Sequence, residues 1–374
     1  MKVLIAGGGT AGHINPALAI AGEIRLRQPD ADITFVGTPT GMESRLVPAE
    51  GYKFETMNVA GFQRKLNFTN IKRNFKAAWY LATSGRRAKQ IVKKIQPDIA
   101  IGTGGYVSGP ILRKAAQMGV PIIIHEQNAY PGVTTKALSK KAKKVMLAVE
   151  DARSRLDENL PIAITGNPIR HDIMTYDKGR ARKELGVDDR PLILSFGGSL
   201  GARRINEGML ELLCRSAQDG RYNHIHGYGQ YGHFVMDELA ARGVDPEKCD
   251  NLDVREYIND MPRVMAAADL VICRAGAITL SELQAIGKPA ILIPSPNVAE
   301  NHQYHNAMAL VRRGAADIIV ESDLTCELLN EKADAILSDT EKLRAMSESS
   351  HNMAITDACS RIYDIITEVL SQEK

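Results

Sequence analysis

The chain has 374 residues, 44% of them hydrophobic and 24% charged, with a formal net charge of +3. This length suits two α/β domains better than one hydrophobic core, and the composition is that of an ordinary globular protein. So small a net charge does not indicate a nucleic-acid partner, and no apolar run reaches the roughly 18 residues of a membrane-spanning helix.

The N-terminal residues and the cysteines bear on the cellular compartment. The chain enters a strand-like run at Val3 with no basic segment or long apolar stretch before it, so no signal peptide is indicated. The five cysteines lie in the second half without C-x-x-C spacing. Scattered thiols are typical of a reducing compartment, and we expect a cytoplasmic protein.

Strand-like and helix-like stretches alternate through the first half. The short apolar runs are residues 3–6, 33–37, 98–102, 120–126 and 144–149. Each run is nearly continuous instead of alternating with polar residues, which is typical of strands buried on both faces of a parallel sheet. The first half is therefore predicted to be a doubly wound α/β domain.

The pattern restarts after the segment TGNPIRHDI at residues 165–173. The later apolar runs are residues 191–196, 224–229, 269–276, 289–295 and 316–322. We expect two Rossmann-like doubly wound parallel-sheet domains, residues 1–165 and 166–345, that face each other across a cleft. Residues 346–374 are expected to form a C-terminal helix that can return to the first domain.

Each half contains a glycine-rich turn between an apolar run and a helix-like stretch, namely GGGTAGH at residues 7–13 and GGSLG at 197–201. Glycines let the backbone approach a ligand, and a helix N-terminus favours negative charge, so both turns predict phosphate binding. A dinucleotide site is disfavoured because Gly37 and Thr38, not an acid, end the second run. A nucleophilic Ser199 is disfavoured because Thr10 takes its place in the other turn.

Further single residues carry weaker signals. His13 follows the first turn and is a candidate general base, although a capping or packing role is also open. Glu282 lies in the first turns of a helix after a strand, where it can bind both hydroxyls of a ribose or simply complement the helix dipole.

The sequence offers two weak candidates for a metal site. Asp30-Ala31-Asp32 precedes a strand and is expected to be a solvated turn. The histidines at 224, 226 and 233 lack a fourth ligand, so no metal is predicted.

Residues 56–97 contain no Asp or Glu but ten Lys and Arg. Within this segment an apolar stripe at helical spacing lies among cations, formed by Phe68, Ile71, Phe75 and Trp79 beside Lys72, Arg73 and Lys76. The stripe is compatible with burial in its own domain. The absence of acids also fits an anionic membrane surface, where aromatic residues sit at the headgroup level, better than it fits nucleic acid.

Seven motifs occur together in one order: GGGTAGHINPALAIA, GTGGYVSGP, HEQNAYPG, TGNPIR, GGSLGARRIN, CRAGAITLSE and HQYHNA. This set resembles glycosyltransferase family 28, in particular its cytoplasmic N-acetylglucosaminyltransferases that complete the lipid-linked disaccharide precursor of bacterial peptidoglycan. The resemblance covers nearly the whole chain. It implies the GT-B fold of two Rossmann-like domains.

The resemblance implies UDP-N-acetylglucosamine as the donor and no cofactor. The donor contacts that it implies are Thr10, Ala11, Gly12, Asn128, Arg170, Ser199, Ile258, Ala277, Ile278, Thr279, Glu282 and Gln303. Among these, Arg170 and Ser199 would face the phosphates, Ile258 the uracil and Glu282 the ribose. Ala11 replaces a glycine that is common in the family, so the loop would be strained if that position needs a positive φ.

The implied acceptor is undecaprenyl-diphosphate-linked N-acetylmuramoyl-pentapeptide, which places the enzyme at the cytoplasmic face of the membrane. We expect its muramoyl 4-hydroxyl to displace UDP with inversion, and His13 to accept the hydroxyl proton. Three other classes remain open. They are an NAD-dependent oxidoreductase, a UDP-sugar epimerase of the same architecture, and a non-catalytic protein that binds nucleotide sugars or lipid surfaces.

Overall fold

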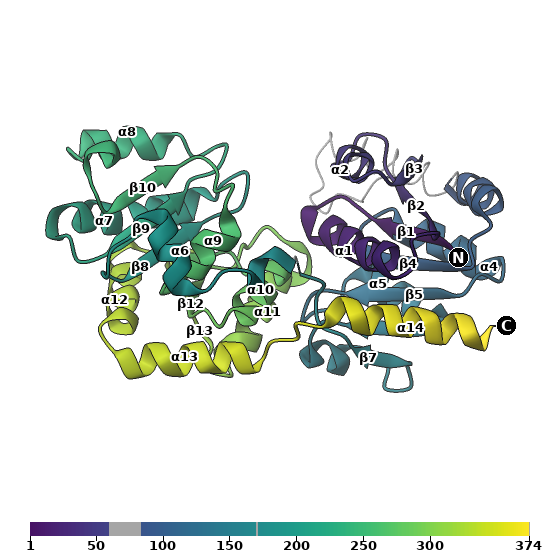
Figure 1. Ribbon diagram of the computed structural model, residues 1–374. Helices are drawn as coiled ribbons and strands as arrows, with labels where there is room; N and C mark the ends of the chain where they lie inside the picture. Colours follow the sequence, from purple (N-terminus) through teal and green to yellow (C-terminus); the bar gives the residue numbers. More distant parts are fainter. Residues whose placement is uncertain (60–83, 170, 374) are drawn as a thin grey trace. The chain divides into compact units, whose positions relative to one another are not determined.

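The computed structural model describes residues 1–59, 84–169 and 171–373, and Figure 1 traces their helices and strands. The chain forms two compact units. The first comprises Met1–Ile169 together with Thr356–Lys374, and the second comprises Arg170–Ile355. The units therefore divide at residues 169 and 355, where the sequence had placed boundaries at 165 and 345.

The first unit contains a seven-stranded sheet in the order β3-β2-β1-β4-β5-β6-β7. All neighbouring strands pair in parallel. The strands are β1 (Lys2–Gly7), β2 (Asp32–Gly37), β3 (Lys53–Thr56), β4 (Ile99–Gly104), β5 (Ile122–Glu126), β6 (Lys144–Leu147) and β7 (Ile162–Ile164). The order reverses between β1 and β4, so this pair marks the switch point of the sheet.

Alternate side chains of each central strand enter two separate cores. In β1, Val3 and Ile5 pack in one buried cluster, whereas Leu4 and Ala6 pack in the other. Both faces are apolar because helices cover both, which explains the continuous apolar run in the sequence. The helices of this unit are α1 (Ala11–Arg27), α2 (Glu43–Ala49), residues 84–95, α4 (Ser108–Gln117), α5 (Val133–Leu138) and α14 (Ala358–Gln372). Its short 3-10 helices are η1 (Ser139–Lys141) and η2 (Glu150–Arg155).

The second unit repeats the plan with six parallel strands in the order β10-β9-β8-β11-β12-β13. The strands are β8 (Leu192–Phe196), β9 (Asn223–Gly227), β10 (Leu252–Arg255), β11 (Leu270–Cys273), β12 (Ala290–Leu292) and β13 (Ala316–Ile318). The switch point falls between β8 and β11. The two-sheet α/β fold expected from the sequence is therefore confirmed.

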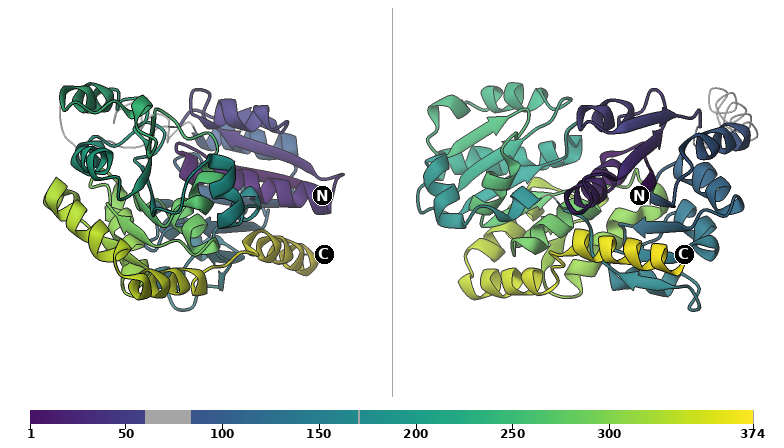
Figure 2. Two further views of the ribbon diagram at one scale, coloured as in Figure 1. Left: turned by 60° about the vertical axis from the view of Figure 1, so that its left-hand side comes forward. Right: turned by 45° about the vertical axis from the view of Figure 1, so that its right-hand side comes forward.

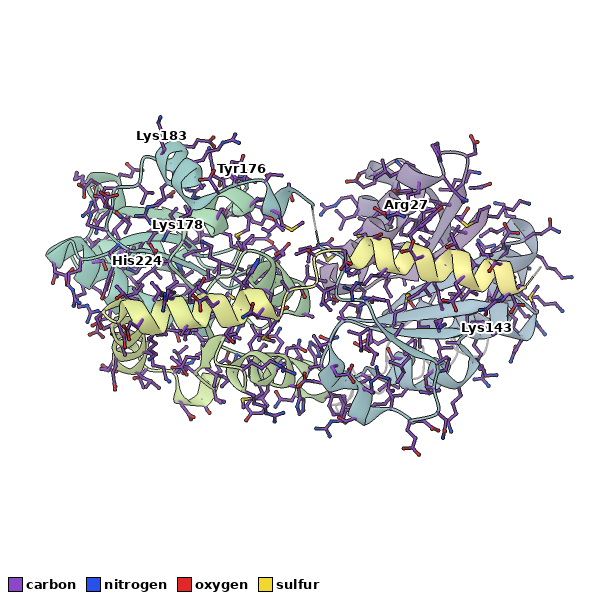
Figure 3. All side chains as sticks on the ribbon, turned by 60° about the horizontal axis from the view of Figure 1, so that its bottom comes forward. Arg27, Lys143, Tyr176, Lys178, Lys183 and His224 are labelled. Atoms are coloured by element: carbon purple, nitrogen blue, oxygen red, sulfur yellow. The ribbon has the colours of Figure 1, made fainter. Side chains whose placement is uncertain are left out.

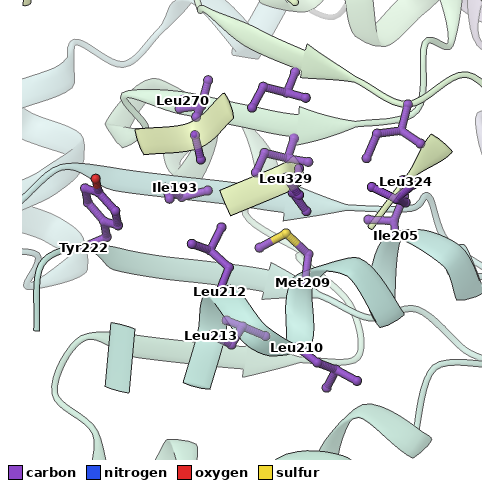
Figure 4. Packing of buried hydrophobic residues seen from close by; sticks show 14 of the residues in the cluster. Ile193, Ile205, Met209, Leu210, Leu212, Leu213, Tyr222, Leu270, Leu324 and Leu329 are labelled. Carbon is purple, nitrogen blue, oxygen red and sulfur yellow. The ribbon is translucent and has the colours of Figure 1, made fainter. Parts of the chain in front are cut away.

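Helices also enclose the second sheet, and Figure 4 shows part of the apolar cluster beneath one group of them. The helices are α6 (Lys178–Leu185), α7 (Arg203–Asp219), α8 (Phe234–Ala241), α9 (Met261–Ala267), α10 (Ala277–Ala285), α11 (His302–Val311), α12 (Cys326–Leu337) and α13 (Thr340–Asn352). The short 3-10 helices are η3 (His171–Met174), η4 (Pro246–Lys248), η5 (Ala299–Asn301) and η6 (Glu321–Asp323). In Figure 4, Met209 of α7 and Leu329 of α12 lie in the same cluster as Ile193 of β8.

The C-terminal segment forms two helices, not the single helix expected from residue 346. Met346 of α13 belongs to the apolar cluster of the second unit. In α14, by contrast, Ile362, Ile366 and Val369 recur at helical spacing and are buried in the first unit against α1 and the sheet. The yellow α14 lies along the first unit in Figures 1 and 2. Burial of these three side chains contributes roughly 1.5–3 kcal/mol each.

Polar contacts also attach α14 to the first unit. Arg27, labelled in Figure 3, donates a hydrogen bond to Ser360 at 2.7 Å and lies 4.9 Å from the ring centre of Tyr363. Lys143 on the other side of the helix in that view forms an ion pair of 2.6 Å with Glu373. These contacts are exposed and each contributes less than the apolar face.

The basic and aromatic segment falls largely outside the described residues, and with it lie Phe68, Ile71, Lys72, Arg73, Phe75, Lys76 and Trp79. Two basic residues in the part of this segment that the structure describes, Arg87 and Lys94, form ion pairs with Glu55 at 3.0 and 2.5 Å. Among the described residues, no helix is both long and apolar enough to cross a bilayer.

Two histidines of β9 are buried in the second unit and are neutral. His226 Nδ1 lies 2.7 Å from Ser195 Oγ, and His224 Nε2 lies 3.0 Å from Ser216 Oγ. Their other ring nitrogens are buried without a hydrogen-bond partner among the described residues. Burial lowers the pKa of His224 to about 3 and that of His226 to about 4. These residues therefore belong to the core and are not arranged as a zinc site.

This burial predicts an acid-sensitive fold. A histidine of ordinary pKa, about 6.5, is protonated in the unfolded chain below that pH but stays neutral in the folded protein. The free energy of unfolding should therefore fall by about 1.4 kcal/mol per pH unit for each histidine as the pH drops from 6.5 toward 4. Urea unfolding of His226→Gln should show a shallower pH dependence than the unsubstituted protein. His351→Gln, which alters an exposed histidine, should keep the original slope. Equal slopes for His226→Gln and the unsubstituted protein would contradict this assignment.

Candidate functional site

In each unit, polar residues gather where the switch-point strands end. Loops that leave β1 and β4 meet at the carboxyl edge of the first sheet, and loops that leave β8 and β11 meet at that of the second. Ligands of doubly wound sheets bind at this edge because the connections depart in opposite directions there.

The first glycine loop leads from β1 into α1. Thr10 is the N-cap of α1 but its side chain makes no capping hydrogen bond, and Ala11 is the first helical residue. The positive φ of this loop falls on Gly9, at +87°, and not on Ala11. Ala11 does not need a positive φ, and its helical conformation suits alanine.

A buried carboxylate that the sequence analysis missed holds this loop. Glu43 of α2 is only 1% exposed. It accepts hydrogen bonds from Gly9 N at 3.1 Å and from both the backbone N and the Oγ1 of Thr38, at 2.9 and 2.7 Å. Burial alone would raise the pKa of this carboxyl, but the hydrogen bonds from Thr38 and Gly9 outweigh it, so the pKa lies below its ordinary value. Glu43 is thus an anion fixed against the glycine loop.

His13 projects from the first turn of α1 and is held at two points by the end of β4. Thr103 Oγ1 donates to the backbone oxygen of His13 at 2.8 Å. The ring Nδ1 of His13 lies 2.9 Å from the backbone oxygen of Thr103 and 3.2 Å from Gln127 Oε1. Gly104 leaves room for the ring, since a Cβ on this residue would lie 2.7 Å from Nδ1. The imidazole is therefore only partly exposed and has a fixed position.

The HEQN motif ends β5 at the same edge of the first sheet. The carboxylate of Glu126 accepts from Asn128 N at 3.1 Å, from Asn128 Nδ2 at 3.0 Å and from Gly132 N at 2.9 Å. It also accepts from Thr135 Oγ1 at 2.5 Å. Glu126 is 3% exposed and shapes the loop that presents Asn128. The first unit thus brings Thr10, Ala11, Gly12, His13 and Asn128 to one edge.

The second glycine loop leads from β8 into α7. Ser199 and Gly198 are exposed, and no side chain caps the N-terminus of α7 at Ala202. Gly201 has φ +84°, and a Cβ there would lie 2.2 Å from the backbone oxygen of Tyr228. Only glycine therefore fits where this loop packs on the loop after β9. Like Thr10 in the first loop, Ser199 is exposed to solvent.

The loop after β11 enters α10. Gly276 is the N-cap of this helix and has no side chain that could cap it. The helix starts at Ala277 and continues through Ile278 and Thr279. Glu282 lies in the next turn and is 8% exposed. Burial and the charge of Glu282 together raise the pKa of the Cys273 thiol to about 12. Glu282 is therefore a nearly buried acid close to the end of β11.

Ile258 follows β10 and is 5% exposed. A Cβ at Gly227, the last residue of β9, would lie 3.1 Å from its Cδ1. This places Ile258 over the carboxyl end of β9, beside the switch point. Its main chain therefore belongs to the same edge as the second glycine loop.

A pocket of about 500 Å³ opens at this edge of the second sheet. Three arginines line it, namely Arg203, Arg204 and Arg274, and none of them is among the donor contacts that the family resemblance implies. Gln303 also lines the pocket, and its Oε1 accepts from Ser295 N at 2.8 Å. Arg274 donates to the backbone oxygen of Ile293 at 3.1 Å and forms an ion pair with Glu321. Three guanidinium groups against the one carboxylate of Glu321 leave the lining net positive beside a glycine loop, which makes this pocket suitable for a phosphorylated ligand.

The chain leading into α11 beside this pocket has an unusual backbone. Glu300 and Asn301 are consecutive non-glycine residues with φ of +53° and +51°. Such conformations cost free energy and persist where the surroundings require them, often at ligand sites. The strained pair directly precedes the helical turn that carries Gln303.

The remaining candidates are Asp32, His233 and Arg170. Asp32 is the first residue of β2, at the opposite end of the sheet from the glycine loop, and forms an ion pair of 2.8 Å with Lys53. His233 Nε2 lies 3.6 Å from Glu256 Oε2. In the part of the chain that the structure describes, no three His, Cys, Asp or Glu side chains are grouped to hold a metal ion. Arg170 lies outside the described residues.

Comparisons with known proteins cover both units. Residues 3–147 match the glycosyltransferase family 28 N-terminal domain, and residues 192–362 match its C-terminal domain. A relative from Acetivibrio thermocellus is 44% identical over 374 residues, covering 100% of this chain and 99% of the relative. That relative is named UDP-N-acetylglucosamine–N-acetylmuramyl-(pentapeptide) pyrophosphoryl-undecaprenol N-acetylglucosamine transferase.

Solved structures share the fold. The crystal structure of Acinetobacter baumannii MurG aligns with a TM-score of 0.77 at 30% identity, covering 98% of this chain and 99% of that one. A structure from Listeria monocytogenes described as a UDP-N-acetylglucosamine 2-epimerase aligns with a TM-score of 0.67 at 14% identity, covering 99% and 97%. At that identity the second likeness concerns the fold alone.

Proposed function

The chain belongs to glycosyltransferase family 28, and on that premise we propose that it transfers N-acetylglucosamine from UDP-N-acetylglucosamine to undecaprenyl-diphosphate-linked N-acetylmuramoyl-pentapeptide. The observation that carries this conclusion is the 44% identity, over the full length of both chains, to a transferase of that name. The polar residues gathered at the carboxyl edge of each sheet are compatible with it. The reaction serves peptidoglycan synthesis.

The second unit is proposed to bind the donor. Its exposed Ser199 loop and the arginine-lined pocket supply N–H groups and positive charge for the diphosphate, and Arg170 joins them by resemblance. The start of α10, with Ala277, Ile278 and Thr279, faces the same edge. Glu282 is suited to accept hydrogen bonds from both ribose hydroxyls because it is a nearly buried acid.

Other donor contacts are proposed for the base and the sugar. The main chain of Ile258 lies where the uracil would reach, at the end of β9. Gln303 in the arginine-lined pocket, together with Asn128 and the turn Thr10, Ala11 and Gly12 of the first unit, is assigned to the N-acetylglucosamine hydroxyls. This assignment follows the family motifs that these residues match.

The first unit is proposed to bind the acceptor and to supply the base. The muramoyl 4-hydroxyl attacks the anomeric carbon, the bond to the UDP oxygen breaks, and the configuration inverts. His13 accepts the hydroxyl proton, since its ring is fixed at the edge where an acceptor reaches the glycine loop. The departing UDP gains negative charge, which the helix N-termini and arginines of the second unit stabilise.

The enzyme is proposed to act as a peripheral protein on the cytoplasmic face of the membrane, because its acceptor carries a lipid. The sequence of residues 56–97 supports this with its excess of cations and its aromatic stripe. Contact with an anionic surface would involve Phe68, Ile71, Lys72, Arg73, Phe75, Lys76 and Trp79.

Removal of the proposed base should separate turnover from donor binding. His13→Ala should lower the rate of labelled N-acetylglucosamine transfer to a lipid-linked muramoyl acceptor by about 10²- to 10⁴-fold. Its affinity for UDP-N-acetylglucosamine, measured by calorimetry, should change little because the donor binds mainly to the second unit. The exposed His351→Ala serves as the matched control and should keep full turnover.

Each alternative outcome has a distinct meaning. Full turnover of His13→Ala would exclude this residue as the base. An unsubstituted protein that binds the donor but transfers nothing would be a binding protein. Release of an altered free sugar without acceptor would identify an epimerase, and a response to NADH instead of UDP an oxidoreductase.

The ribose contact can be tested with a substrate analogue. Glu282→Gln should weaken UDP-N-acetylglucosamine binding by about 1.5–3 kcal/mol, or roughly tenfold to hundredfold, because a hydrogen bond to a charged group is lost. The unsubstituted enzyme should bind the 2′-deoxyuridine analogue more weakly by a similar factor, and Glu282→Gln should hardly distinguish the two ligands. Calorimetry gives the loss of binding free energy caused by Glu282→Gln and the loss caused by the 2′-deoxyuridine analogue. If these two losses simply add when both changes are made, Glu282 does not contact the ribose.

Membrane association should depend on the cations of the proposed docking segment. Lys72→Ala with Lys76→Ala should reduce binding to vesicles containing anionic phospholipid by about 2 kcal/mol, roughly thirtyfold, in a sedimentation assay. The control, Lys342→Ala with Arg344→Ala, removes the same charge from exposed residues of α13 and should bind like the unsubstituted protein. Equal losses in both variants would mean that net charge alone drives binding, and the segment would lose its assigned role.

A further inference from the structure

Beside His13, a chain of hydrogen bonds connects three segments of the first unit. Gln127 Oε1 lies 3.2 Å from His13 Nδ1, and Gln127 Nε2 lies 2.9 Å from His125 Nδ1. His125 Nε2 in turn lies 2.9 Å from the backbone oxygen of Gly166. Gln127 and His125 are 3% and 1% exposed. The chain thus runs from the helix α1 turn through the end of β5 to the segment after β7.

The donors and acceptors of this chain can be assigned from its far end. The oxygen of Gly166 can only accept, so His125 Nε2 carries a proton. Burial lowers the pKa of His125, and the ring is neutral. Its Nδ1 is therefore an acceptor, and the Gln127 amide nitrogen must be the group that donates to it.

The amide orientation has a second, independent constraint. Gln127 Nε2 also donates to the backbone oxygen of His125 at 3.0 Å, and that oxygen cannot act as a donor. Asn167 Nδ2 donates to the backbone oxygen of Gln127 at 3.2 Å and holds the main chain in place. With its nitrogen so engaged, the amide must direct Oε1 toward His13.

The orientation of Gln127 determines the protonation pattern of His13. Gln127 Oε1 and the backbone oxygen of Thr103 both accept, and both face His13 Nδ1. A proton on Nδ1 satisfies both oxygens, and a lone pair there would repel them. In the neutral ring this leaves the lone pair on Nε2, which is the atom that must accept a proton from a substrate.

We propose that Gln127 is a positioning residue whose amide, oriented by His125, holds the His13 imidazole in the tautomer that is protonated on Nδ1 and basic at Nε2. The inference rests on the proposed function only for its catalytic consequence. The tautomer itself is a property of the protein without substrate. His125 and Gln127 of the HEQN motif thereby gain a role that is separate from the donor contact of Asn128.

The tautomer can be read directly from ¹⁵N NMR of the full-length protein labelled at histidine, at a pH of about 8.5, where a histidine of ordinary pKa is neutral. The His13 signals are assigned by their loss in His13→Gln. The unsubstituted protein should show a protonated Nδ1 and an unprotonated Nε2. This measurement tests the inference without any change to Gln127.

Two substitutions of similar size separate hydrogen bonding from packing. Gln127→Met removes the acceptor and should allow a population protonated on Nε2, with kcat for transfer lowered about tenfold to hundredfold and the KM for UDP-N-acetylglucosamine nearly unchanged. Gln127→Glu keeps an oxygen toward His13 and, with its other oxygen protonated, can still donate to His125 Nδ1, so it should retain the Nδ1-protonated tautomer. A role limited to packing would affect the two variants alike.

The outcomes distinguish the inference from the proposed function. An unsubstituted protein protonated on Nε2, or a Gln127→Met protein with unaltered tautomer and kcat, would overturn the inference. If the expected tautomers appear but no variant transfers sugar, the positioning by Gln127 stands and the proposed function fails.

Discussion

The reversal of strand order inside each sheet is the constraint on which both loop clusters depend. At β1 and β4, and again at β8 and β11, adjacent parallel strands send their connections to opposite faces. The connections therefore diverge there and leave a crevice at the carboxyl edge, where a ligand can reach the helix N-termini. Gly104 lies at the first of these points, and a Cβ on it would lie 2.7 Å from His13 Nδ1. Gly201 lies in the loop after β8, where a Cβ would lie 2.2 Å from the backbone oxygen of Tyr228 in the loop after β9.

Much of the framework was predictable because apolar runs are a direct consequence of burial on both sheet faces. Residues 3–6 were predictable as a buried strand for that reason. The start of α14 was not predictable, because residues 346–374 are amphipathic throughout and α13 and α14 differ only in which unit receives their apolar face. The expected single helix was wrong on this point.

The site was predictable where a local motif marks it and not where distant residues meet. The glycine loops, His13 and Glu282 could be selected from their place after a strand. Glu43 could not, since its short helix has no distinctive pattern and its contact with Gly9 spans 34 positions of sequence. The arginines of the second unit lie inside the motifs GGSLGARRIN and CRAGAITLSE, but the sequence does not show that these distant side chains line one pocket. HEQN was recognised as a motif, but the hydrogen bonds that explain its His and Gln join β5 to α1 and to the segment after β7, which are distant in the sequence.

The two glycine loops resemble each other in sequence but differ in charge. In the first loop the N–H of Gly9 is already bound to the ionised Glu43, whose lowered pKa keeps its negative charge at the edge of the sheet. A second anion placed there would be repelled. In the second loop Ser199 is exposed, and three arginines line the adjoining pocket. This difference in charge supports the proposal that the second unit binds the donor diphosphate and that the first loop, next to His13, receives the neutral hydroxyls of a sugar.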